Sequence, residues 1–168
     1  MKTQDISSTL ASLFSELVNG PPAGGGAYML NSGDIGLLRS LDKLSAADAS
    51  RAVNGGATIA AHAQHLRFGL SLMNRWAREG GDPFTNAKWD EAWKINVVDE
   101  QDWAEIRQRL GGEAHRWREA LSTPREAAPM ELAGLIGSIG HLAYHLGAIR
   151  QINKETRGPR EGSFTPAH

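Results

Sequence analysis

Two histidines four residues apart are the side chains of this 168-residue chain that are best placed for chemistry. His141 and His145 lie in the stretch HLAYHLGAIRQI near the C-terminus, which predicts a helix. Four residues of an α-helix advance by about 400° and rise by about 6 Å, so both imidazoles leave one face a single turn apart. Imidazole is the commonest metal ligand, so this spacing indicates two ligands to one divalent ion.

A second pair of histidines lies far upstream. His62 and His65 occur in TIAAHAQHLRF, which also predicts a helix. At about 100° per residue, His62 lies centrally on the apolar stripe of this helix and His65 at its edge, so periodicity alone favours His62 as the inward-facing residue. The HExxH pattern of zincins is absent, so no glutamate base accompanies the later pair. Either pair taken alone is also compatible with surface or core histidines.

The segments around both pairs share one layout with a known family. Its members typically have a Ser or Thr at the start of the second core helix, a His seven residues later followed by Leu, and a His-x-x-x-His pair on the last core helix, often followed by Gly, Gln and Ile. The matching residues here are Thr58, His65, Leu66, His141, His145, Gly147, Gln151 and Ile152. Over roughly residues 34–153 the chain therefore resembles the DinB/YfiT-like superfamily, a large set of small four-helix metal proteins.

The resemblance implies a metal triad of His65, His141 and His145. A ligand belongs at the boundary between the apolar core and an open pocket, which agrees with the edge position of His65. His62 would then line the pocket, support a ligand, or be a buried histidine with a polar neighbour. The chain departs from the family at Gly56-Ala57, where a Trp often precedes the Ser or Thr, and at Ala148, where a Gln is usual. These departures concern contacts with a substrate and not the triad.

A site of three histidines without a carboxylate leaves a position open for water or substrate. Its ion can polarise a carbonyl group or lower the pKa of water or of an incoming thiol. Zinc, nickel and iron(II) all suit imidazole ligands. The resemblance implies a metal-dependent transferase or isomerase that uses a low-molecular-weight thiol, or a hydrolase, acting on a small-molecule substrate. The alternative is a non-catalytic binding or stress-related helical bundle with a structural or vestigial metal site.

Composition and charge narrow the class of protein. The formal net charge is −1 at pH 7, so no basic field indicates nucleic acid or an anionic membrane as a partner. The chain has no cysteine, which excludes disulfides and a cysteine nucleophile. The N-terminus lacks the apolar run of a signal peptide, and no stretch approaches the about 18 apolar residues of a membrane span, which favours a cytoplasmic protein. We also expect a homodimer, because two-fold dimers are the commonest oligomers and small bundles often leave a helix face uncovered.

Helical periodicity predicts an all-α fold. The expected helices cover residues 3–19, 34–44, 58–78, 99–121 and about 129–155, with a short turn after Ser45. Side chains that could cap the N-termini are Asp34, Ser45, Thr58 and either Asp99 or Asp102. Gly111-Gly112 predicts a kink or two shorter helices, since each glycine costs about 1 kcal/mol relative to alanine. The whole is a four-helix bundle with an extra short helix and long connecting segments over residues 1–157, followed by a polar tail, 158–168.

One connecting segment, residues 82–98, contains two tryptophans, Trp89 and Trp93. They predict either a cover over the open end of the bundle or a lid over the metal pocket, and the two interpretations are compatible. Two other histidines, His115 and His168, have no partner at metal-ligand spacing and are expected to be solvated. Tyr144, between the paired histidines, could line the pocket or be an ordinary core or surface tyrosine.

Overall fold

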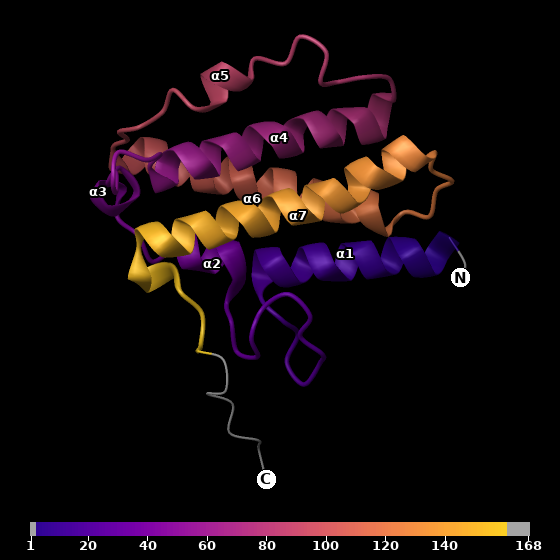
Figure 1. Cartoon of the computed structure of the whole chain (residues 1–168), viewed down its shortest axis with the longest axis horizontal. Coiled ribbons are helices and arrows are strands. Elements are labelled where there is room, and N and C mark those ends of the chain that lie inside the picture. Colours follow the sequence, from indigo (N-terminus) through magenta and orange to yellow (C-terminus); the bar gives the residue numbers. More distant parts are fainter. Residues whose placement is uncertain (1–2, 161–168) are drawn as a thin grey trace.

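A computed structural model describes residues 3–160 of the chain, and every regular element in that range is helical (Figure 1). The all-α prediction is therefore confirmed. The four long helices are α1 (Thr3–Asn19), α4 (Ile59–Glu79), α6 (Glu100–Ser122) and α7 (Pro129–Ile152). The short ones are α2 (Gly36–Leu41), α3 (Ala46–Ala49), α5 (Trp89–Ala92) and the 3₁₀ helix η1 (Lys154–Thr156).

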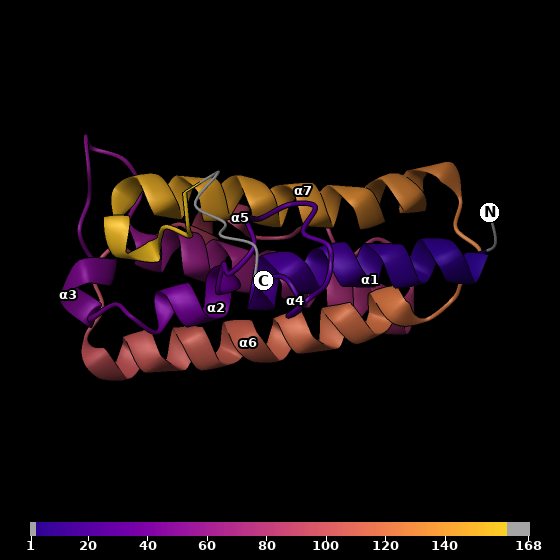
Figure 2. The same ribbon diagram turned by 90° about the horizontal axis from the view of Figure 1, so that it is seen from below.

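The long helices lie side by side around one apolar core. Figure 2 shows α1 between α6 and α7, with α4 behind it, and α6 and α7 each pack against both α1 and α4. Large side chains from all four helices are fully buried between them, among them Phe14, Leu66, Trp117 and Leu142. Burying one such side chain stabilises the fold by about 1.5–3 kcal/mol.

Three of the predicted helix caps are confirmed. The hydroxyl of Thr58 accepts a hydrogen bond from the Ala61 N–H at 3.2 Å, and the Asp99 carboxylate accepts one from the Asp102 N–H at 2.8 Å. Ser45 forms a capping box with Asp48 before α3. Each cap stabilises its helix by about 0.5–2 kcal/mol. The cap at Thr58 fixes where α4 begins and hence the position of His62 and His65 along the helix axis.

The predicted cap at Asp34 is wrong. Helix α2 begins later, at Gly36, and its N-cap Ile35 offers no side-chain hydrogen bond. The Asp34 carboxylate is instead buried, where it accepts hydrogen bonds from the Gly36 N–H at 2.8 Å and from Arg150 Nη2 at 2.8 and 2.9 Å. The pairing with Arg150 explains the difference, because it joins α2 to α7 across the fold.

Two other expectations about the helices need correction. Helix α6 runs unbroken through Gly111-Gly112, because buried Leu110 and Ala114 pack on both sides of the glycine pair and outweigh its low helix propensity. Helix α7 ends at Ile152 and not at 155. Asn153 leaves the helix with extended backbone, and its side chain accepts the Glu155 N–H at 2.9 Å, which starts η1. Residues 161–168 of the predicted tail, His168 included, lie outside the described residues.

Helix α7 is more apolar than the sequence reading assumed. By length and composition it is the one helix of the described chain that could cross a membrane, at a mean hydropathy of 1.3 over its most apolar window. Core helices of soluble proteins pass the same test, so this is weak support for a span. Leu135, Ile139, Leu142, Leu146 and Ile149 of α7 are buried against the other helices, as expected of a packed helix.

Candidate metal centre

Helices α4 and α7 run antiparallel, so the first part of α4 lies beside the last part of α7 (Figure 1). This arrangement brings His62 and His65 of α4 to His141 and His145 of α7. The neighbours in each pair are three or four residues apart, so both project from one side of their helix. The two histidine pairs, separated by more than 70 residues of sequence, form one cluster.

Three ring nitrogens converge within this cluster. His141 Nε2 lies 3.1 Å from His65 Nε2 and 3.0 Å from His145 Nε2. One ligand atom from each of these three residues lies within 4.8 Å of the others. A four-coordinate ion with Zn–N bonds of 2.0–2.1 Å would separate two ligand nitrogens by about 3.3–3.4 Å. Two of the three nitrogen pairs thus lie within a few tenths of an ångström of the spacing that a divalent ion needs.

His62 lies on the other side of His145 and outside this set. Its Nδ1 contacts His145 Nδ1 at 2.8 Å. The structure thus places His65, and not His62, with the α7 pair, as the family layout implies. The sequence placed His62 centrally on the apolar stripe of its helix, and in the structure this side chain does face α7 and is buried.

Burial and mutual repulsion hold these imidazoles neutral. Burial lowers the pKa of His62 and His141. Burial, together with the charges that His141 and His62 would carry, lowers the pKa of His65 to about 4. The same effects, with His65 as a further neighbour, lower the pKa of His145 to about 3. Near pH 7 the nitrogen lone pairs are free of extra protons, as metal binding requires.

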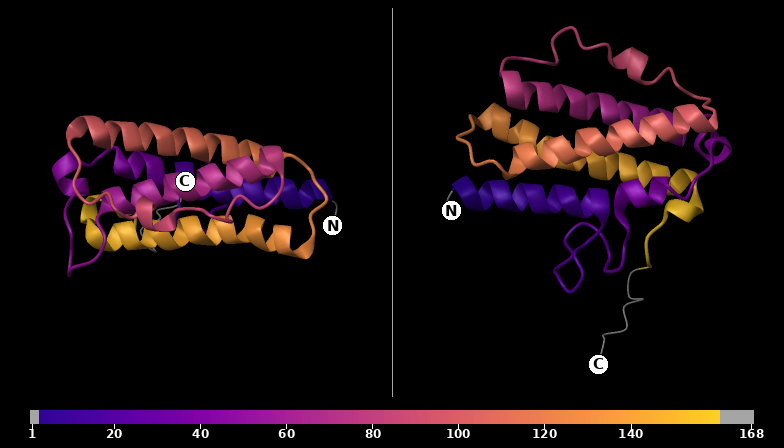
Figure 3. Two further views of the ribbon diagram at one scale, coloured as in Figure 1. Left: turned by 90° about the horizontal axis from the view of Figure 1, so that it is seen from above. Right: turned by 180° about the vertical axis from the view of Figure 1, so that it is seen from behind.

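Two tryptophans cover one side of the cluster. The Trp93 ring stacks on His65 with ring centroids 4.2 Å apart and an interplanar angle of 23°, and it meets His62 edge-on at 5.4 Å. The Trp89 ring lies 5.5 Å from His65 and contacts Phe68 at 5.2 Å. The segment 82–98 returns along the length of α4 and does not close the end of the helices (Figure 3). Its place agrees with the lid interpretation and not with an end cover.

The opposite side of the cluster is more open. His141 keeps part of its surface exposed to solvent, whereas His65 and His145 are buried. Tyr144 meets the His145 ring edge-on at 5.1 Å, with 72% of its surface exposed. Gly69 of α4 lies between Trp89 and His141, since a Cβ there would lie 3.8 Å from Trp89 and 3.9 Å from His141. His141 is therefore the member of the triad that solvent reaches.

Sequence reasoning missed the contact between the tryptophans and His65. The pair of tryptophans in a connecting segment was the available signal, but their partner depends on how the segment returns over α4. His115, expected to be solvated, is indeed exposed and lies 3.3 Å from Glu119.

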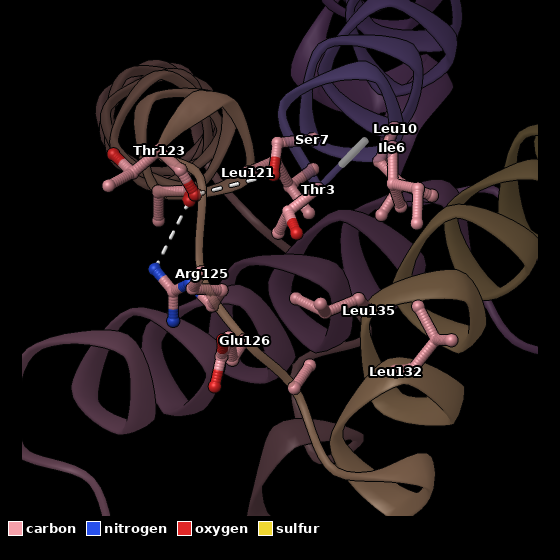
Figure 4. Close-up of a pocket in the computed structure, with 12 residues that line it drawn as sticks. Thr3, Ile6, Ser7, Leu10, Leu121, Thr123, Arg125, Glu126, Leu132 and Leu135 are labelled. Atoms are coloured by element: carbon pink, nitrogen blue, oxygen red, sulfur yellow. Dashed lines mark hydrogen bonds between the residues drawn. The ribbon is translucent and has the colours of Figure 1, made fainter. Parts of the chain in front are cut away.

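The described structure also has cavities away from the histidines. One of about 390 Å³ lies at the far end of the helices, where the start of α1, the end of α6 and the start of α7 meet (Figure 4). Its walls are mainly apolar, with Leu10, Leu121 and Leu135, and Arg125 at its edge donates to the Ala120 carbonyl at 3.2 Å. It contains no histidine, so its lining offers no metal ligand set.

Comparison with known proteins finds no family model that matches the chain, no matching curated protein and no matching solved structure. The likeness to the DinB/YfiT-like superfamily therefore rests on the residues quoted above. What the described structure adds is an all-helical chain in which three histidines from two helices lie close enough together to hold one metal ion.

Proposed function

We propose that the protein is a metal-dependent enzyme of the DinB-like class that binds one divalent ion through His65, His141 and His145. The convergence of three Nε2 atoms is the observation that carries the proposal. The lowered pKa of each ligand supports it, because neutral imidazoles are the metal-binding form. Zinc, nickel and iron(II) are the candidate ions.

The bound ion supplies a Lewis acid that lowers the pKa of water or of a thiol and polarises a carbonyl group. The chain supplies the rest of the site. Trp93 and Trp89 exclude water from the His65 side, and the exposed His141 side admits the substrate. Phe84 stacks on Trp89 with centroids 6.4 Å apart, which extends an apolar wall. Such a wall fits a small molecule with an apolar or aromatic group, either as the partner of a thiol or as an ester or amide to be hydrolysed.

The test is elemental analysis of untagged protein, followed by assays of thiol transfer and of hydrolysis with the ion restored. We expect about one ion per chain and activity that is lost on chelation. The triple alanine variant of His65, His141 and His145 should contain no stoichiometric metal. If that variant retains its full metal content, the assignment is wrong.

A non-catalytic metal protein is the second candidate. The cavity of about 390 Å³ at the far end of the helices favours it, because no histidine lines that cavity. In that case the ion would raise the melting temperature without supporting turnover of any thiol or ester. The same assays therefore separate the two functions.

We also propose a homodimer built on the outer face of α7. No charged residue occurs between Glu131 and Arg150, and Met130, Ile136 and Tyr144 are exposed on this helix. A Cβ at Gly137 or Gly140 would meet nothing within 4 Å in the described chain, so a second copy could approach closely. Sedimentation should show a dimer that Ile136→Lys dissociates, whereas Val97→Lys, at an exposed valine off this helix, should not. A monomer at micromolar concentration would refute the dimer.

A further inference from the structure

His62 makes the shortest contact within the histidine cluster. Its Nδ1 lies 2.8 Å from His145 Nδ1, and both side chains are buried. The contact joins α4 to α7 beside the three converging Nε2 atoms without adding a fourth nitrogen to them. A buried contact of this length between two ring nitrogens needs one proton between them.

The position of that proton follows from the other end of the His145 ring. His145 Nε2 points at His141 Nε2 and needs its lone pair free in order to bind an ion. A neutral imidazole carries one proton, so the proton of His145 then resides on Nδ1. His62 Nδ1 must accept it, which places the proton of His62 on Nε2. The pair has one tautomer assignment that is compatible with metal at Nε2.

The other two candidate ligands lack such support. His65 Nδ1 is buried with no hydrogen-bond partner in the described chain. Within residues 3–160, His145 is the one member of the triad whose second ring nitrogen makes a hydrogen bond in the structure. Metal-bound histidines almost always donate this second N–H, which fixes the ring and raises its basicity. His145 is therefore the ligand whose orientation is prepared in advance.

Neighbouring groups fix His62 and keep its contact dry. The backbone N–H of His62 donates to the Thr58 carbonyl at 3.1 Å in the capped first turn of α4. The Trp93 ring closes over His62 edge-on. A hydrogen bond that is shielded from water is electrostatically stronger than an exposed one.

Resting on the proposed metal site, we propose that His62 is a positioning residue: its Nδ1 accepts the Nδ1–H of His145 and holds the Nε2 lone pair of His145 toward the ion. His62 itself does not touch the ion. The role explains why a second histidine on α4 is buried three residues before the ligand.

The test compares Zn²⁺ affinities by calorimetry for the metal-stripped wild type, His62→Asn and His62→Leu. Asparagine places an amide oxygen near the position of Nδ1 and keeps an acceptor, whereas leucine leaves the His145 N–H without a partner. Loss of such a supporting group costs about ten- to hundredfold in metal affinity, and we expect about tenfold for His62→Leu. His62→Asn should stay within about threefold of the wild type. His115→Leu, at an exposed histidine, is the matched control and should have no effect.

A spectroscopic measurement on the wild type avoids any folding defect of the variants. Long-range proton–nitrogen NMR correlations of ¹⁵N-histidine-labelled, zinc-loaded protein should show the proton of His145 on Nδ1 and that of His62 on Nε2. Any other pattern overturns the positioning role, as do equal losses in the asparagine and leucine variants. Tight binding by the wild type and by His62→Leu alike overturns the positioning role alone. No binding by the wild type overturns the proposed function as well.

Discussion

Helix α7 contributes to two buried polar clusters that differ in kind. In one, the Arg150 guanidinium meets the Asp34 carboxylate, which also accepts a backbone N–H. In the other, four imidazoles face one another, and the hydrogen bonds and ring contacts found for them include no carboxylate. The opposite charges of Asp34 and Arg150 attract each other and join the start of α2 to α7. Four neutral imidazoles have no opposite charge among them. Because each offers a lone pair, a shared proton or metal ion is what can hold them together.

The comparison separates polar groups that build the fold from those that prepare a site. Glu16 belongs with the first kind, since its buried carboxylate accepts the N–H groups of Tyr28, Met29 and Leu30 at 2.7–3.1 Å. The histidine cluster instead leaves His65 Nδ1 buried without a partner, and it has no ion pair like that of Asp34 with Arg150, whose own Nε is also buried without a partner. A buried polar group without a partner costs about 1–3 kcal/mol, so the cluster is a poor device for stability alone.

The largest expected effect is on metal binding by His145→Ala. This variant removes one ligand and also leaves His62 without its partner. We expect stoichiometric binding to be abolished, with a loss in affinity above the roughly hundredfold maximum for a residue that only supports a ligand. Calorimetric titration with Zn²⁺ measures the loss, and near-wild-type affinity would contradict the ligand role of His145.

The next effect is on stability, in the other cluster. Asp34→Ala leaves the mostly buried Arg150 without its partner, which should cost about 3–5 kcal/mol. For a chain of this length that corresponds to a melting temperature lower by about 6–20 °C. Asp42→Ala is the matched control, since the Asp42 side chain is 60% exposed in its pair with Arg107 and the pair should contribute about 0–1 kcal/mol. If Asp34→Ala weakens metal binding as much as it weakens the fold, the two clusters are not separate.

Local chemistry explains what the sequence could predict. The caps at Ser45, Thr58 and Asp99 involve residues only three positions apart, so composition and spacing determine them. Helical periodicity likewise predicted the four long helices. The inward side of both histidine-bearing helices followed from the same periodicity.

Contacts between distant segments explain what it could not. The partner of Asp34 lies 116 residues away, so its predicted cap was wrong. A helical wheel could not decide between His62 and His65, because both side chains face α7. Only the position of α4 along α7 determines which ring nitrogen lies beside those of His141 and His145. The stacking of Trp93 on His65 depends on the path of a connecting segment, which no periodicity predicts.

The pH dependence of stability is a further property in which the histidine cluster differs from the ion pair. The folded pKa values of about 4 for His65 and about 3 for His145 lie below the unfolded value of about 6.5. The unfolded chain therefore binds more protons in this window, and the metal-free protein is fully stable above about pH 6.5 and loses stability as pH falls toward about 4 and 3. Proton competition at His65 and His145 begins only near these lowered values.

Melting curves of the metal-loaded and metal-stripped protein from about pH 8 to about pH 4 test this. At an ion concentration 100 times the dissociation constant, the ion should add about 2.7 kcal/mol of stability. We expect the gap to persist at about pH 5 and to close toward about pH 4, because His65 and His145 stay neutral until then. Solvated histidine ligands would close the gap already by about pH 5. A gap that is absent at pH 8 would count against the site.

The smallest effect concerns His65, the ligand without a partner on its second nitrogen. His65→Ala leaves the α7 pair and its link to His62 intact, so it should weaken metal binding less than His145→Ala does. We expect a loss of at least about 1.4 kcal/mol, a tenfold change, and a greater one than His62→Ala causes. Titration of both α4 variants in parallel decides the order. If His62→Ala is the more damaging, the ligand role on α4 passes to His62, and the convergence at His65 Nε2 reflects packing beneath Trp93 alone.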